Sequence, residues 1–154
     1  MISDVIIKRL NKYQDERGWL AEIYRSDEFN YQPVMSYISV TKPNVIRGPH
    51  EHKFQSDCFI FIGPGSFKLY LWDGRIENRE NFDKENEYME IEVGENNPML
   101  IIVPPGVVHA YKCVSDCDGW CINFPDKLYK GKEKKEEVDE IRWENNLESP
   151  YKIQ

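Results

Sequence analysis

The feature that most constrains the fold of this chain is a two-residue hydrophobic alternation that recurs along most of its length. In residues 66–72, aliphatic and aromatic side chains fall on one face of an extended strand, while Lys68, Tyr70 and Trp72 fall on the other. Similar short runs are rich in β-branched residues and are separated by turn residues such as Gly63-Pro64-Gly65. Because aromatic side chains occupy both faces of a strand, we expect two packed sheets.

The alternation predicts an all-β domain. We expect strands at residues 20–25, 35–41, 58–62, 66–73, 88–93, 99–103, 107–114 and 120–124. Short strands at this spacing are typical of a sandwich or barrel. We find no internal repeat or linker, and therefore expect residues 1–154 to form a single domain.

Two charged stretches interrupt the strand pattern. Residues 77–87 are predicted to be a solvated loop between strands. Residues 130–143 are predicted to form a short C-terminal helix, with Val138 and Ile141 docking it and its charged side chains facing water. Neither stretch is assigned a function from its sequence.

Charge and hydropathy narrow the classes of partner. The chain has 20 basic and 27 acidic side chains, a net charge of -7, which argues against nucleic acid as the main partner and still permits a local basic pocket for a phosphorylated small molecule. No apolar run approaches the roughly 18 residues of a membrane helix. Residues 1–12 alternate charged and apolar side chains, unlike a signal peptide. We therefore expect a cytoplasmic protein with no membrane partner.

The three histidines are the most informative polar residues. His50 and His52 lie two positions apart, so that both imidazoles point to the same face of an extended strand. His109 falls in a Pro-x-Gly-x-x-His pattern, in which a turn leads into a strand that begins near the histidine. Because imidazole is a frequent catalytic group and metal ligand, the whole histidine supply in these two motifs predicts one shared site.

These two segments resemble the motifs of the cupin superfamily, which are small jelly-roll β-barrels. Four segments are together similar to the dTDP-4-dehydrorhamnose 3,5-epimerase family, namely residues 15–22 (DERGWLAE), 47–50 (RGPH), 103–110 (VPPGVVHA) and 141–143 (IRW). The resemblance implies a cupin-type jelly-roll barrel. It also implies a homodimeric epimerase, without metal or other cofactor, that acts on a dTDP-4-keto-6-deoxyhexose in deoxysugar and polysaccharide biosynthesis.

On the matching positions, the resemblance implies that Arg17, Glu22 and Arg47 bind the nucleotide and that His50 is the general base. His109 would orient or polarise the sugar. An imidazole with a pKa near 6.5 is a suitable base at neutral pH for a C–H that a neighbouring ketone acidifies.

The chain departs from the family at the acid and its helpers. The family has glutamine at the position of His52, a lysine near Cys58 and a catalytic tyrosine near Asn123, and its supporting aspartate lies beyond Trp143. Epimerisation needs a proton donor on the face opposite the base. Tyr37 is the first candidate for this acid and Tyr111, on the face of His109, is the second.

An alternative is a sugar 3,4-ketoisomerase, because residues 50–53 resemble the HxHK motif of those related cupins. Two histidines on one face, His50 and His52, would move a proton from C3 to C4 through an enediol. Lys53 would then contact the substrate.

Two further alternatives belong to other classes. In a metal-dependent cupin enzyme, His50, His52 and His109 would bind iron, manganese, nickel or zinc together with Asp57 or Gln55. In a non-catalytic sugar-nucleotide binding protein, the nucleotide pocket would remain although the acid has been lost.

Overall fold

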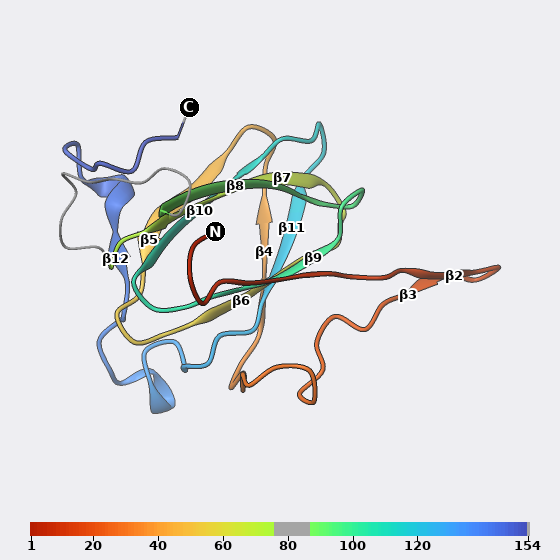
Figure 1. Ribbon diagram of the computed structural model, residues 1–154, viewed down its shortest axis with the longest axis horizontal. Coiled ribbons are helices and arrows are strands. Elements are labelled where there is room, and N and C mark those ends of the chain that lie inside the picture. Colours follow the sequence, from red (N-terminus) through yellow and green to blue (C-terminus); the bar gives the residue numbers. More distant parts are fainter. Residues whose placement is uncertain (76–86, 154) are drawn as a thin grey trace.

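Two five-stranded antiparallel sheets face each other, as the alternation predicts, in a computed structural model that describes residues 1–75 and 87–153 (Figure 1). The first sheet has the order β1 (Ile6–Arg9), β9 (Met99–Val103), β6 (Asp57–Phe61), β11 (Gly119–Asn123) and β4 (Tyr37–Thr41). The second has the order β12 (Ile141–Arg142), β5 (Ile46–Glu51), β10 (Val107–Cys113), β7 (Ser66–Asp73) and β8 (Tyr88–Gly94). A separate hairpin of β2 (Tyr13–Asp15) and β3 (Gly18–Leu20) projects away from the sheets.

The core between the sheets is aromatic. The rings of Phe61 and Phe67 lie 5.2 Å apart, and Tyr111 lies 5.4 Å from Phe67, measured between ring centroids. The opposite face of β7 is also buried, because Trp72 packs against Tyr151 from the C-terminal tail, at 5.7 Å. One apolar face of β7 is therefore buried by the facing sheet, and the other is buried by the C-terminal tail.

The predicted C-terminal helix is wrong. Residues 130–143 contain only a 3-10 turn at Lys132–Lys134, the strand β12 and the start of a second 3-10 turn at Trp143–Asn145. The backbone at Lys130, Glu133 and Lys134 has positive φ angles of 59°, 56° and 60°, which a right-handed helix does not allow. Pairing of β12 with β5 also competes with helix formation. Residues 125–140, which connect β11 to β12, are called the strap below.

Most predicted strands are confirmed to within two residues at each end, and 66–73 and 99–103 match fully. The strand predicted at 20–25 is wrong, because β3 ends at Leu20 and residues 21–25 have no strand partner. The loop predicted at 77–87 lies, except for Glu87, outside the described residues. Within the described part of the chain, no helix has the length and apolar character needed to cross a membrane.

Candidate active site

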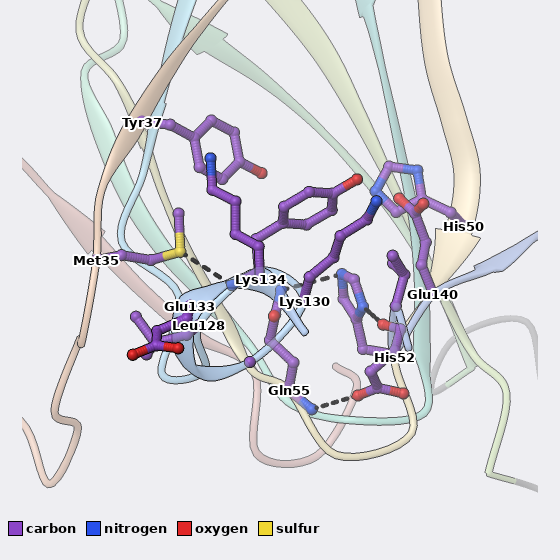
Figure 2. A pocket seen from close by; sticks show the side chains of 14 residues that line it. Met35, Tyr37, His50, His52, Gln55, Leu128, Lys130, Glu133, Lys134 and Glu140 are labelled. Carbon is purple, nitrogen blue, oxygen red and sulfur yellow. Dashed lines mark hydrogen bonds between the residues drawn. The ribbon is translucent and has the colours of Figure 1, made fainter. Parts of the chain in front are cut away.

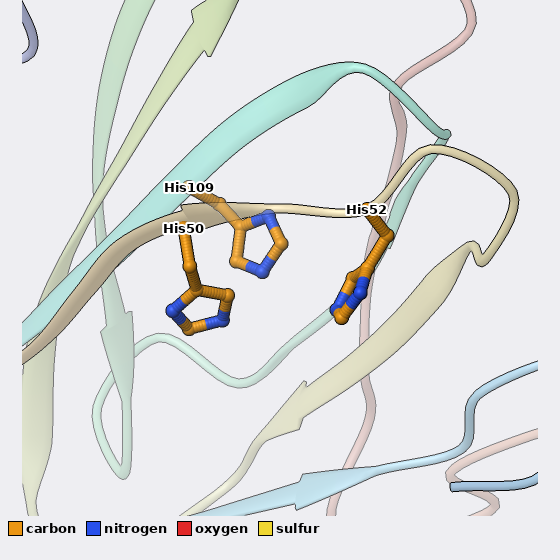
Figure 3. Close-up of side chains that lie close together, drawn as sticks. All are labelled: His50, His52 and His109. Atoms are coloured by element: carbon orange, nitrogen blue, oxygen red, sulfur yellow. The ribbon is translucent and has the colours of Figure 1, made fainter. Parts of the chain in front are cut away.

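The three histidines converge at one end of the second sheet (Figure 3). His50 on β5 pairs in register with His109 on β10, and their rings lie 4.4 Å apart. His52 follows the end of β5, with its ring 6.0 Å from that of His50 and 5.9 Å from that of His109. Gly48 permits this approach, because a Cβ atom there would lie 2.6 Å from the His109 carbonyl oxygen.

A buried carboxylate on the facing sheet links two of the histidines. Asp57, at the start of β6, is 2% exposed, and its Oδ2 lies 3.2 Å from Nε2 of His52 and 3.3 Å from Nε2 of His109. Its other oxygen, Oδ1, accepts hydrogen bonds from the side-chain amides of Gln55 at 2.9 Å and Asn123 at 2.8 Å. Both carboxylate oxygens are therefore engaged, as a buried charge requires.

Backbone carbonyls fix the orientation of the same two imidazoles. Nδ1 of His109 donates to the Val107 carbonyl at 3.1 Å, and Nδ1 of His52 donates to the carbonyl of Asp139 in the strap. Each ring therefore directs Nε2 toward Asp57. The His109 Nε2 atom is buried and lacks the alignment of a hydrogen bond to Asp57, despite the short separation.

The protonation states of the site follow from these contacts. Burial disfavours the charged form of Asp57, but the histidines beside it hold the pKa of that carboxyl well below its ordinary value. Burial also opposes protonation of His52, yet the hydrogen bond and attraction to Asp57 raise its pKa above the ordinary value. Burial, followed by repulsion from His109, lowers the pKa of His50 to about 2. A neutral imidazole thus stands beside a charged carboxylate–imidazole pair.

The donor set also fits a divalent cation. His50, His52 and His109 each offer a ring nitrogen, and these nitrogens lie within 4.8 Å of one another. Asp57 adds a carboxylate, and the carbonyls that hold Nδ1 of two rings supply the outer hydrogen bonds that ligating histidines need. A cation bound by these four residues would supply Lewis-acid polarisation of a substrate carbonyl.

Two cavities meet at His50. The larger, of about 600 Å³, lies between the end of the barrel and the strap, and it is lined by His50, His52 and Tyr37 together with strap residues (Figure 2). The smaller, of about 330 Å³, is lined by His50 and Tyr37 and by the two guanidinium groups of Arg47 and Arg142. His50 is therefore accessible from both sides of the site.

The two candidate acids differ in their surroundings. Tyr37 on β4 is 45% exposed, and its hydroxyl accepts a hydrogen bond from Nδ2 of Asn123 at 2.9 Å. Burial of the phenol raises the pKa of Tyr37 to about 12. Tyr111 is 5% exposed, and its hydroxyl lies 2.9 Å from that of Ser39. Burial raises the pKa of Tyr111 as well, so both phenols are protonated at neutral pH.

Of the three predicted nucleotide-binding residues, one lines a cavity and two do not. Arg47 lines the smaller cavity, where its guanidinium donates to the Thr41 hydroxyl and the Val40 carbonyl. Arg17 and Glu22 lie on and after the projecting hairpin and line neither cavity; Arg17 pairs with Asp15, and Glu22 with Arg25.

Lys53 is exposed and also lies outside the lining of both cavities. Its backbone N–H donates to the Asp139 carboxylate at 3.0 Å, as do those of Phe54 at 2.8 Å and Gln55 at 3.0 Å. Asp139 therefore fixes the turn that follows His52. Sequence reasoning missed this residue, because it lies in a charged stretch that appeared to be a solvated helix face.

Comparisons with known proteins show which family the sequence is similar to. The family model described as dTDP-4-dehydrorhamnose 3,5-epimerase matches residues 1–147. A probable low-salt glycan biosynthesis epimerase of Haloferax volcanii is 34% identical over 138 residues, which cover 88% of this chain and 86% of that protein. The spore coat polysaccharide biosynthesis protein SpsL of Bacillus subtilis is 34% identical over 131 residues, covering 84% of this chain and 83% of that protein.

Solved structures support the fold. A dTDP sugar isomerase from Desulfovibrio desulfuricans superposes with a TM-score of 0.80 at 18% identity, covering 98% of this chain and 91% of that one. A 3,4-ketoisomerase from Helicobacter canadensis superposes with a TM-score of 0.66 at 21% identity, with 90% of each chain covered. These likenesses confirm the predicted cupin-type jelly roll.

Proposed function

The chain belongs to the dTDP-4-dehydrorhamnose 3,5-epimerase family, and we propose that it epimerises a dTDP-4-keto-6-deoxyhexose at a carbon next to the ketone. The family is one of isomerases that act on carbohydrate derivatives, and the two curated relatives are named for glycan and polysaccharide biosynthesis. The observation that carries the proposal is the position of His50, a neutral imidazole where two cavities meet.

In the proposed reaction His50 is the general base. It takes the proton from the carbon next to the ketone, the C–H electron pair forms a carbon–carbon double bond, and the carbonyl π pair moves to the ketone oxygen. At neutral pH the lowered pKa leaves the His50 ring unprotonated, so its nitrogen lone pair is free to take the proton, although the same shift makes the ring a weaker base than a free imidazole. His52, whose ring nitrogens are directed to the Asp139 carbonyl and to Asp57, lines the same cavity as His50 and would place a positive charge near the enolate that forms.

Tyr37 is the proposed acid that returns a proton to the opposite face of the enolate. Its hydroxyl bonds to Asn123, the position near which the family carries its catalytic tyrosine, so a phenol from β4 stands near that place in the site. Tyr111 is the weaker candidate, because its hydroxyl is buried and bonded to Ser39.

We also propose that the protein acts as a homodimer. Arg17 and Glu22 line neither cavity of their own chain, and in a dimer they would contact the nucleotide bound to the other copy. The hairpin that precedes Glu22 extends away from its own barrel (Figure 1), and a second copy is the partner that the family resemblance implies. Exposed apolar side chains on this hairpin and on β4 and β11 are available to such an interface: Trp19, Leu20, Ile38, Val40 and Trp120. Light scattering coupled to gel filtration gives the mass in solution, and a monomer would contradict the proposal.

A second candidate is 3,4-ketoisomerisation, favoured by the second histidine. His50 and His52 line the same larger cavity, with ring centroids 6.0 Å apart, so both can reach one side of a bound sugar ring. Such a pair could carry the carbon-bound proton from C3 to C4. The C3 hydroxyl loses its proton and the C4 oxygen gains one, so that the carbonyl moves from C4 to C3.

Proton NMR in D₂O distinguishes these reactions. Chelator-treated protein is incubated with dTDP-4-keto-6-deoxyglucose beside a His50→Ala control, and the signals at C3 and C5 are followed. Loss of both signals in the unsubstituted protein supports 3,5-epimerisation; loss at C3 alone indicates 3-epimerisation or ketoisomerisation, which the product spectrum separates. Exchange only after a metal is restored would replace the proposal with a metal-dependent enzyme. No exchange under any condition would leave a binding protein or a different substrate.

A further inference from the structure

The strap has an unusual backbone where it covers the larger cavity. Lys130, Gly131, Glu133 and Lys134 all have φ angles between 56° and 65°, in the left-handed region that side-chain-bearing residues seldom adopt. Hydrogen bonds hold this conformation, including one from the Gly131 N–H to the Leu128 carbonyl at 2.8 Å. Backbone of this kind persists where the surrounding structure fixes it and is common at ligand-binding sites.

One consequence of this backbone is that two lysines face the histidines. Lys130 and Lys134 line the larger cavity with His50 and His52, and their amines extend across it toward the side where Tyr37 and His50 lie (Figure 2). The other two lysines of the same turn, Lys132 and Lys135, do not belong to this lining.

The charges at the cavity are unbalanced in favour of these lysines. Three acidic side chains also line it, but each has a partner: Glu133 pairs with Lys135, Glu140 with Arg142 at 2.7 Å, and Asp139 with three backbone N–H groups. Among the described residues, neither Lys130 nor Lys134 has an ion pair, and the Lys130 amine lies 5.8 Å from the centre of the Tyr129 ring. Two lysines without an ion pair therefore face a cavity in which Asp139 is the one lining carboxylate, among the described residues, that no cationic side chain neutralises.

We propose that Lys130 and Lys134 bind the diphosphate of the nucleotide-linked substrate and so hold its sugar against His50. This inference deepens the proposed function and rests on it for the identity of the sugar. The diphosphate of a nucleotide sugar carries two negative charges, which matches two free ammonium groups. A cavity of about 600 Å³ is of the size that holds such a ligand. Both lysines and His50 line this cavity, so one ligand can contact all three.

The two arginines of the smaller cavity already have partners. Two of the guanidinium nitrogens of Arg47 already donate to Thr41 and Val40. Arg142, across that cavity, is engaged by Glu140. Arg142 is thus neutralised by Glu140, and Arg47 keeps its charge but is tethered by two neutral acceptors, whereas neither strap lysine is held by an ion pair among the described residues.

Calorimetric titration with dTDP tests the proposal, because this ligand contains the diphosphate without the reacting sugar. We expect Lys130→Gln and Lys134→Gln each to weaken dTDP binding about tenfold, as for loss of a charge-assisted hydrogen bond. Lys132→Gln is the matched control from the same turn and should keep the affinity within about twofold of the unsubstituted protein. Thermal unfolding of each variant confirms that it is folded.

Thymidine separates the diphosphate from the nucleoside. Its affinity should be the same in all three variants, because it carries no phosphate for the lysines to contact. Equal losses of dTDP affinity in the test and control variants, no loss in either test variant, or an unsubstituted protein that does not bind dTDP would each overturn the assignment.

The outcome is distinguishable from failure of the proposed function. If dTDP binding depends on Lys130 and Lys134 but no sugar proton exchanges, the lysine site stands and the epimerase proposal fails. If the protons exchange through His50 but neither lysine affects dTDP binding, the epimerase proposal stands and the diphosphate lies elsewhere.

Discussion

Replacement of Asp57 by asparagine tests whether charge holds the histidines of the site in place. The substitution preserves volume and leaves one oxygen to accept the hydrogen bonds of Gln55 and Asn123. It removes the negative charge that lies 3.2 Å from His52 and 3.3 Å from His109. The substitution therefore changes the interactions with the two imidazoles and keeps those with the two amides.

The expected cost follows from the burial and alignment of these contacts. Removal of one member of a buried ion pair costs about 3–5 kcal/mol, and a single charge-assisted hydrogen bond contributes about 1.5–3 kcal/mol. Asp57 raises the pKa of His52, which makes this imidazole the charged partner, so we expect His52 to account for most of the effect. We therefore expect Asp57→Asn to lower the free energy of unfolding by about 3 kcal/mol near pH 6, a large fraction of the 5–15 kcal/mol of a typical domain.

The pH dependence gives the sharper test. The pKa of Asp57 is lower in the folded protein, so its stabilisation is present above the unfolded value of about 3.9 and is lost as the pH falls. The pKa of His52 is raised to about 9, so its stabilisation is complete below the unfolded value of about 6.5 and is lost as the pH rises through the folded value. The difference between the two proteins should be largest from about pH 4 to 6.5 and should shrink toward pH 9.

Urea unfolding of chelator-treated protein at pH 5, 6, 7.5 and 9 measures this difference. Asp126→Asn is the control, because Asp126 accepts a hydrogen bond from the Ser56 backbone N–H at 2.9 Å and contacts no histidine. A difference below about 1 kcal/mol for Asp57→Asn at every pH, or one that grows as the pH rises, would refute the charge-based account of the site.

Three further predictions concern the acid, the strap and the core. Tyr37→Phe should slow formation of the inverted product about 100-fold in the NMR assay, and Tyr111→Phe should not; equal effects would remove Tyr37 as the acid. Asp139→Ala removes the acceptor of three backbone N–H groups and should cost about 1–3 kcal/mol. It should also speed amide hydrogen exchange after His52, and unchanged protection there would show that the carboxylate does not hold this turn. Gly119→Ala would place a Cβ atom 2.4 Å from the Phe67 ring, so we expect a loss of about 1–3 kcal/mol in urea unfolding, which an unchanged midpoint would contradict.

The strands could be predicted because their signals are local. Residues 66–73 carry apolar side chains at positions 67, 69 and 71 and are bounded by glycine turns, so the local pattern marks both ends. The convergence of the histidines could also be predicted, since His50 and His52 share a face by spacing. The register between the strands could not be predicted, because the pairing of His50 with His109 joins residues that lie 59 positions apart in the sequence.

The strap shows where local signals fail. Its lysine and glutamate content is that of an exposed helix, and propensity is a weak guide once long-range contacts compete with it. Those contacts lie outside any local window: the Asp139 carboxylate binds backbone N–H groups 84 to 86 residues away, and β12 adds a strand to β5. The sequence predicts Asp57 only as a metal ligand for a similar reason, because its partners in the fold come from three separate strands or turns.

These long-range contacts form one continuous chain of hydrogen bonds and close ion contacts through the site. The chain runs from the Tyr37 hydroxyl to Asn123, from Asn123 to Asp57, from Asp57 to His52 and from His52 to the carbonyl of Asp139 in the strap. The proposed acid is therefore joined to the segment that carries the proposed diphosphate-binding lysines. Because a shift of the strap would move the Asp139 carbonyl and with it the His52 ring, anion binding at the strap and the alignment of the acid should be coupled. Turnover of a sugar lacking the diphosphate should then fall by more than its loss of affinity accounts for.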